Sequence, residues 1–209
     1  MPSIPRAASA AVPLLLLAAL VACTPPAGGS GGTGEGDPEG DGGEGARTGA
    51  STECVSRTWA LDINDAAAQL GEHLASSGMS VISTSGEGVQ TISFAQDGQV
   101  TTHNDVTFMV SADGGEGVEI TVVQTHSGDT AGEWYWEGDS DSRVAFDAYD
   151  SGEYTISTTT LVNGMAGEPS TTTPTGGEGG SGMSIDCSAD GLATQADGSP
   201  FTQHWVPRD

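Results

Sequence analysis

The stretch that decides the fold is QTISFAQDGQVTTHNDVTFMV, residues 90–110. Apolar residues alternate with polar ones on both sides of the pair Asp97-Gly98. Alternation with a period of two is typical of a strand with one buried face, and an Asp-Gly pair between two such runs indicates a β-hairpin. The stretch therefore predicts two antiparallel strands that turn these side chains toward a core: Ile92, Phe94, Val100, Val106, Phe108 and Val110.

The same alternation continues through VEITVVQTHSG (118–128), GEWYWEG (132–138) and several shorter runs, so we expect about nine or ten strands. Their threonine and β-branched residues suit a pleated sheet with one wet face. The segment 61–79 breaks the pattern, because its apolar residues recur at helical spacing. It predicts one amphipathic helix after the first strand, packed against the open end or the flank of a barrel.

The N-terminus has the features of an export signal. An apolar segment from about Ala7 to Ala22 is too short to span a bilayer comfortably and fits the hydrophobic region of a secretory signal. The four residues Leu20-Val21-Ala22-Cys23 resemble the lipobox of bacterial lipoproteins. That resemblance implies a signal peptide over 1–22 and a Cys23 thiol that receives a diacylglycerol, with palmitate as an acyl chain. Ordinary signal cleavage with an unmodified Cys23 is the alternative.

Residues 23–53 have the composition of a flexible linker. Eleven of the twenty-two residues from Gly28 to Gly49 are glycine, and none is aromatic or a β-branched aliphatic. Such a segment buries too little surface to offset its chain entropy, so we expect it to be disordered. Together with a lipid on Cys23, it predicts a domain tethered to the extracytoplasmic face of the cell membrane.

The chain has three cysteines, and an odd number in an exported protein leaves at least one cysteine outside any disulfide within the chain. If Cys23 carries lipid, Cys54 and Cys187 are left as a pair in an oxidising compartment, where a disulfide persists. Metal ligation by two such distant cysteines is the weaker alternative, since the sequence has no CxxC motif.

The formal net charge is −24, and none of the five basic residues is a lysine. Such a surface repels the phosphates of nucleic acids and anionic headgroups, so we expect no nucleic-acid partner and no membrane contact except through the lipid on Cys23. We expect a monomer.

The sequence predicts no catalytic residue, no metal site and no cofactor. It has neither a G-x-S-x-G motif nor an HExxH motif, and its four histidines are widely spaced. Asp139, Asp141 and Asp150 have EF-hand-like offsets. Arg143 and Val144, however, occupy positions that need a ligand and a glycine, which favours a solvated turn.

Four short motifs resemble lipocalins and lipocalin-like bacterial domains. SRTWALD (56–62) resembles their G-x-W strand, ISFAQDGQVT (92–101) and GEWYWEGDS (132–140) resemble their hairpin strands, and HWVPR (204–208) resembles their closing strand. The resemblance implies that residues 54–209 form a mainly β domain. Its fold is expected to be an antiparallel up-and-down β-barrel with one short helix, as in the lipocalin-like lipoproteins of actinobacteria.

The function predicted from these residues is the binding of a small hydrophobic or amphiphilic ligand inside the barrel. Polar residues share the phase of apolar ones, and a cavity with a few polar groups would accommodate them. The candidate ligand-lining residues are Asn104, Gln124, His126, Trp134 and Trp136. Three alternatives stay open: the polar residues reach solvent at the barrel rim, the strand phases reset at bulges, or the tryptophans are simply core. In the last case the domain is a structural or protein-interaction module with a solidly packed barrel.

Overall fold

The computed structural model describes residues 51–138, 141–174 and 181–208. The predicted signal peptide, Cys23 and most of the predicted linker lie outside these residues. The described helices are α2 (Thr52–Val55) and α3 (Ile63–Ser76). The described strands are β1 (Thr58–Leu61), β2 (Val81–Phe94), β3 (Gln99–Gly115), β4 (Val118–Trp136), β5 (Arg143–Asp150), β6 (Thr155–Val162), β7 (Met165–Ala166), β8 (Ser170–Thr172), β9 (Ser181–Cys187), β10 (Leu192–Ala196) and β11 (Gln203–Pro207).

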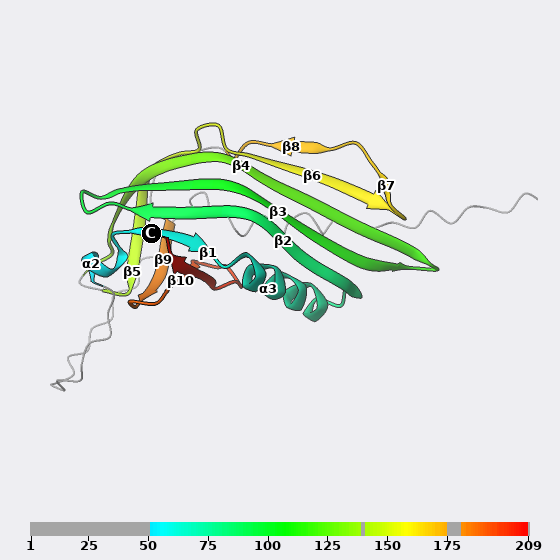
Figure 1. Cartoon of the computed structure of the whole chain (residues 1–209), viewed down its shortest axis with the longest axis horizontal. Helices are drawn as coiled ribbons and strands as arrows, with labels where there is room; N and C mark the ends of the chain where they lie inside the picture. The colour runs from blue at the N-terminus through cyan, green and yellow to red at the C-terminus, as the bar shows by residue number, and fades with distance from the viewer. Residues whose placement is uncertain (1–50, 139–140, 175–180, 209) are drawn as a thin grey trace, which may run out of the picture.

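Eight of these strands close into an antiparallel barrel, in the order β4-β3-β2-β1-β11-β10-β9-β5 and back to β4 (Figure 1). The predicted fold class is therefore confirmed, as is the helix after the first strand. The β2–β3 hairpin forms where the Asp97-Gly98 pair predicts it, and Gly98 has the positive φ of 87° that such a turn requires.

Strand β4 has two successive partners on the same side. Its residues 131–136 pair with β5 inside the barrel, whereas residues 120–127 pair with β6. At 19 residues β4 spans roughly 60 Å, more than the barrel uses. The surplus lengths of β2, β3 and β4, at residues 81–90, 104–115 and 118–128, form with β6, β7 and β8 a second region that we call the extended sheet.

Two glycines mark the boundary between the barrel and the extended sheet. Gly88 in β2 has φ 102° and Gly128 in β4 has φ 106°, both in the left-handed half of the map. A Cβ atom on Gly128 would lie 2.7 Å from the carbonyl oxygen of Glu153. Both strands therefore bend at positions where only glycine fits without strain.

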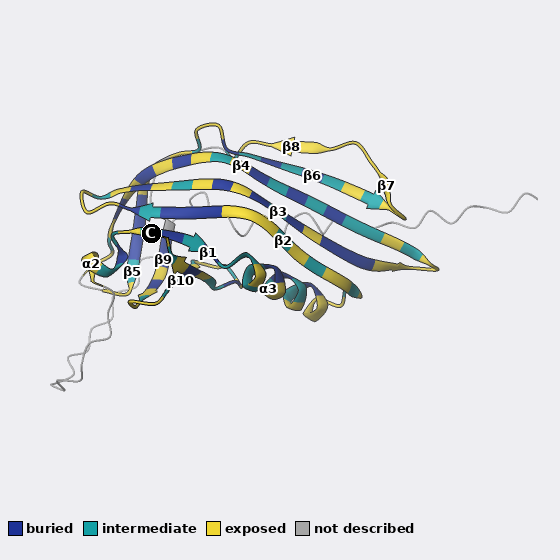
Figure 2. Cartoon of the chain, viewed as in Figure 1, coloured by how far each residue is buried: buried dark blue, intermediate teal, exposed yellow. Residues whose placement is uncertain are grey.

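Helix α3 lies against β2 and covers one face of the extended sheet, as Figures 1 and 2 show. It begins at Asp62, whose carboxylate accepts a hydrogen bond from the N–H of Asp65, and its buried residues are Ala67, Leu70 and Leu74. The two leucines pack with Val110, Val122 and Phe201 in a cluster separate from the barrel core. The first half of the helix also touches the barrel core through Ala67, so α3 packs against both the barrel and the extended sheet. No helix in residues 51–138, 141–174 or 181–208 has the length and apolar character needed to cross a membrane.

Candidate functional site

Large side chains pack against one another in the barrel interior. Trp59, Phe94, Trp134 and Trp205 are each at most 5% exposed and belong to one hydrophobic cluster. The three indole N–H groups donate to the Val55 carbonyl, the Ala95 carbonyl and the Thr194 hydroxyl, at 3.0, 3.0 and 2.8 Å. Buried indoles with satisfied N–H groups form a rigid core.

The two tryptophans predicted to line a ligand belong to this barrel core. Trp134 packs edge-to-face against Phe94, with ring centroids 5.3 Å apart, and against Trp136 at 5.7 Å. The Nε1 of Trp136 donates to the Thr52 hydroxyl of α2 at 2.9 Å. Both rings thus already have protein partners at the barrel end near α2.

The candidates Gln124 and His126 lie instead in the extended sheet, where each is 1% exposed. The Nε2 of Gln124 donates to the Thr158 hydroxyl at 3.3 Å, which leaves its Oε1 to accept from Nε2 of His126 at 2.9 Å. Nδ1 of His126 then accepts from the Tyr154 hydroxyl at 2.6 Å. The register of β4 against β6 makes this series of hydrogen bonds possible, because it places Gln124 opposite Thr158.

The pKa of His126 is lowered to about 4, because burial disfavours the imidazolium form. The ring is therefore neutral at physiological pH, in agreement with an Nδ1 that accepts a hydrogen bond. A neutral, fully bonded histidine stabilises the sheet as a polar contact and carries no charge for a ligand to recognise.

The last candidate, Asn104, joins β2, β3 and β4. It accepts from Nε2 of Gln90 at 2.9 Å and donates to the Gly128 carbonyl at 3.0 Å. Asn104 is 3% exposed, so the alternative in which these residues reach solvent at the rim is wrong for Asn104, Gln124 and His126. They share one sheet face, as their phase predicts, but the structure does not bring them together with Trp134 and Trp136. A role toward a ligand stays a prediction for all five.

The structure also has an open hollow that the sequence did not indicate. It has a volume of about 640 Å³ and extends over β2, β3, β4 and the turn that follows β5. On its wall, His103 Nδ1 and Asp129 Oδ1 lie 2.6 Å apart, with both side chains more than half exposed. Asp150 and Glu153 also line it. The hollow depends on strand register and on the bend at Gly128, which local alternation does not specify.

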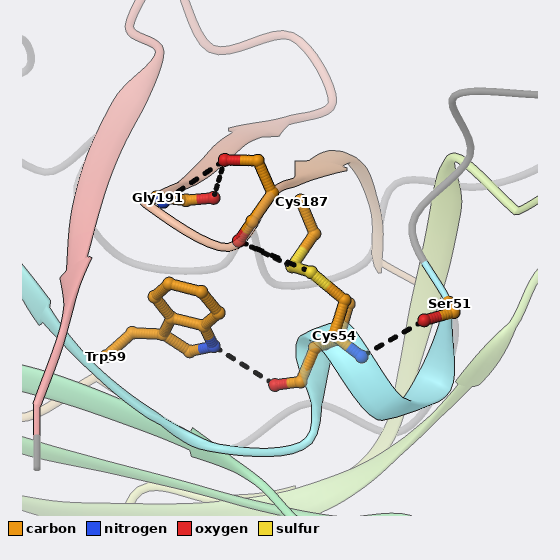
Figure 3. Close-up of a disulfide and its surroundings, with 7 residues drawn as sticks. Ser51, Cys54, Trp59, Cys187 and Gly191 are labelled. Carbon is orange, nitrogen blue, oxygen red and sulfur yellow. Dashed lines mark hydrogen bonds between the residues drawn. A yellow bond between two sulfur atoms is a disulfide. The ribbon is translucent and has the colours of Figure 1, made fainter.

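A disulfide joins Cys54 of α2 to Cys187 of β9, with Cα atoms 6.2 Å apart (Figure 3). The predicted pairing is confirmed, and the metal-ligand alternative for these two cysteines is wrong. Ser51 caps α2 by accepting from the N–H of Cys54 at 3.1 Å. The last residues of the predicted linker, 51–53, thus belong to α2 and its cap, and the disulfide fixes the chain to the barrel at Cys54.

The barrel also carries an exposed ion-pair network. Arg143 of β5 donates through Nη2 to both carboxylate oxygens of Asp197, at 3.1 and 2.8 Å, and through Nε to Glu137 at 2.8 Å. These hydrogen bonds, first to Asp197 and then to Glu137, raise the pKa of Arg143 above its usual value. Among the described residues, no three His, Cys, Asp or Glu side chains are grouped so that they could hold a metal ion. Asp139, the first residue of the EF-hand-like pattern, lies outside those residues.

Comparison with known proteins gives no match to this chain among protein-family models, among curated proteins or among solved structures.

Proposed function

We propose that the chain is a lipid-anchored, non-catalytic protein of the cell envelope, in which a solidly packed barrel supports the extended sheet as a contact surface for another envelope component. The observation that carries this proposal is the cluster of large, buried side chains in the barrel interior. A barrel whose inward side chains already contact one another has the properties of a scaffold. The predicted small hydrophobic ligand is accordingly not assigned to the barrel interior.

The face of the extended sheet that is turned away from α3 supports the contact role. It carries hydroxyl and apolar side chains together with the exposed carboxylate of Asp105. Thr107 bonds to Thr125 at 3.0 Å, and Ser111 bonds to Thr121 at 2.8 Å. Met109 lies between these two pairs and is 41% exposed. In a chain of net charge −24, a face of this composition suits an uncharged or cationic partner and disfavours an anionic one.

Membrane attachment is tested by Cys23→Ala. Because the chain is acidic, the lipid is the only anchor that the sequence predicts, so this variant should leave the membrane fraction for the medium or stay unprocessed. Cys54→Ser is the matched control, since it removes a different cysteine and should leave the protein on the membrane. Unchanged membrane retention of Cys23→Ala contradicts the anchor.

The contact surface is tested by photo-crosslinking in intact cells. A photoreactive side chain replaces Met109 on the extended sheet or, as the matched control, Tyr135, which is 50% exposed on the barrel. We expect a discrete crosslinked product from position 109 and not from position 135. Equal products from both positions, or none from position 109, contradict the assignment.

A second proposal is the binding of a small polar ligand in the hollow beside His103. The volume of about 640 Å³ favours it, and the carboxylates of Asp129, Asp150 and Glu153 suit a polyol or an amine better than an apolar molecule. Native mass spectrometry of the exported protein should then detect a copurified small molecule that is lost in His103→Ala. A copurified lipid that survives this substitution contradicts the hollow as the site and supports the predicted hydrophobic ligand.

A further inference from the structure

The edge of the extended sheet carries a run of consecutive hydroxyl residues. Residues 170–173 read Ser-Thr-Thr-Thr and lie between Pro169 and Pro174. All four are exposed, and the first three form β8. A composition rich in serine and threonine, with prolines alongside, is typical of O-glycosylated stalks.

The pairing of β8 leaves one of its sides open. Within the described part of the chain β8 pairs with β6 alone, with Thr171 opposite Ser157. Pro169 and Pro174 have no N–H to donate, so each end of the segment resists the addition of another strand. The segment is therefore an extended and accessible chain, the form in which a peptide enters the groove of a modifying enzyme.

The hydroxyls of this run differ from those in the middle of the sheet. Thr107 and Thr125 bond to each other, and each of their strands is paired on both sides. Of the four hydroxyls at 170–173, only that of Thr172 has a bond in the described structure, to the Ile156 carbonyl at the long distance of 3.5 Å. Solvent is thus the main partner of the run, and a substituent on these oxygens displaces no internal hydrogen bond of normal length.

Charge also sets the segment apart. Between Asn163 and Pro174 the only ionisable residue is Glu168, although the whole chain has 29 acidic residues. Edge strands are commonly protected from pairing with other chains by charged side chains, and β8 has none. A bulky polar substituent would supply the same protection.

We propose that one or more of Ser170, Thr171, Thr172 and Thr173 are O-glycosylated in the exported protein. The hydroxyl oxygen attacks the anomeric carbon of a sugar that is activated as a phosphate ester, on a nucleotide or a polyprenyl carrier. The anomeric C–O bond to phosphate breaks, and the phosphate leaves with the electron pair. The hydroxyl proton passes to a base of the glycosyltransferase, so that one glycosidic bond replaces one sugar–phosphate bond.

The experiment is intact-mass and peptide analysis of the full chain purified from the cells that produce it, using a fragmentation method that retains O-linked groups. We expect mass increments of whole hexose units, located on the peptide that contains residues 170–173. Replacing all four residues by alanine should abolish these increments. The matched control replaces four exposed hydroxyl residues of longer strands, Ser83, Ser85, Thr101 and Thr160, and should leave the increments unchanged.

Three results overturn the proposal: an unmodified 170–173 peptide, sugar that persists in the fourfold alanine variant, or a phosphate in place of sugar. Circular dichroism of the two fourfold variants shows whether each is folded. If the 170–173 variant fails to fold, peptide analysis of the wild-type protein decides the question alone.

Discussion

At the scale of single residues, His126 is a neutral ring between partners with fixed roles. The Gln124 oxygen can only accept, so Nε2 of His126 must carry its proton and Nδ1 must accept from Tyr154. A second proton, on Nδ1, would oppose the donated hydroxyl. Hydrogen bonding and burial therefore favour the same protonation state.

Stability should consequently fall as His126 is driven toward protonation. The folded pKa of about 4 lies below the unfolded value of about 6.5, so the unfolded chain binds more protons between these limits. The contribution of neutral His126 to the free energy of unfolding is fully present above pH 6.5. It is lost as the pH falls toward 4, and the loss is about 3 kcal/mol at most. Urea unfolding of wild type and His126→Gln over this range measures the loss, with His103→Gln as an exposed control. Parallel curves for wild type and His126→Gln contradict the prediction.

A glycine at the bend of β4 allows a second prediction. Gly128→Ala should destabilise the fold by about 2–4 kcal/mol, because a positive φ costs about 1–2 kcal/mol and the new methyl group meets the Glu153 carbonyl oxygen at 2.7 Å. Gly117→Ala is the matched control: its φ is 78°, with open space around the new carbon, so it carries only the backbone cost. The free energies of unfolding of the two variants, measured in urea, should differ by the cost of the contact between the new methyl group and Glu153. Equal losses of stability in the two variants would show that this contact has no effect.

At the scale of elements, α3 holds the extended sheet to the rest of the molecule. Leu74 is 3% exposed in the cluster with Val110, Val122 and Phe201. Leu74→Ala should therefore cost about 2–5 kcal/mol. The exposed Glu72→Ala on the same helix should change stability by less than about 0.5 kcal/mol. Hydrogen exchange should show faster opening of β2 and β3 in Leu74→Ala, and exchange that speeds up only in the barrel would argue against this packing role.

Local pattern predicted the elements that depend on neighbours in the chain. Alternation and an Asp-Gly turn specify the hairpin over 90–110, and helical spacing specifies 61–79. The sequence of β4 has no local pattern that predicts its change of partner, because the pairing with β5 or β6 depends on strands that come later in the chain. One strand thus passes through two environments, which separates His126 from Trp134 and explains why the candidate site could be predicted only in part.

At the scale of the whole molecule, the disulfide closes a loop between residues 133 positions apart. In the chain-entropy model such a bond contributes about 5 kcal/mol, less any native strain. Reduction, or Cys54→Ser with Cys187→Ser, should lower the unfolding temperature while the packed barrel still folds. Calorimetry with and without reductant measures the change, and the double variant should be insensitive to reductant. An unfolding temperature that does not change on reduction contradicts the prediction.

The position of this bond also determines how the domain bears a pulling force. If the protein is held by its N-terminus, load from flow or from a bound neighbour enters at Cys54 and divides between the chain leading into β1 and the sulfur bridge to β9. β1 is four residues long and is paired over three positions with each of its neighbours, so alone it would be peeled away one hydrogen bond at a time. β9 is held between β5 and β10. The covalent bridge therefore spreads the tension over two strands, β1 and β9, and the barrel should resist unfolding under a force that would detach β1 alone.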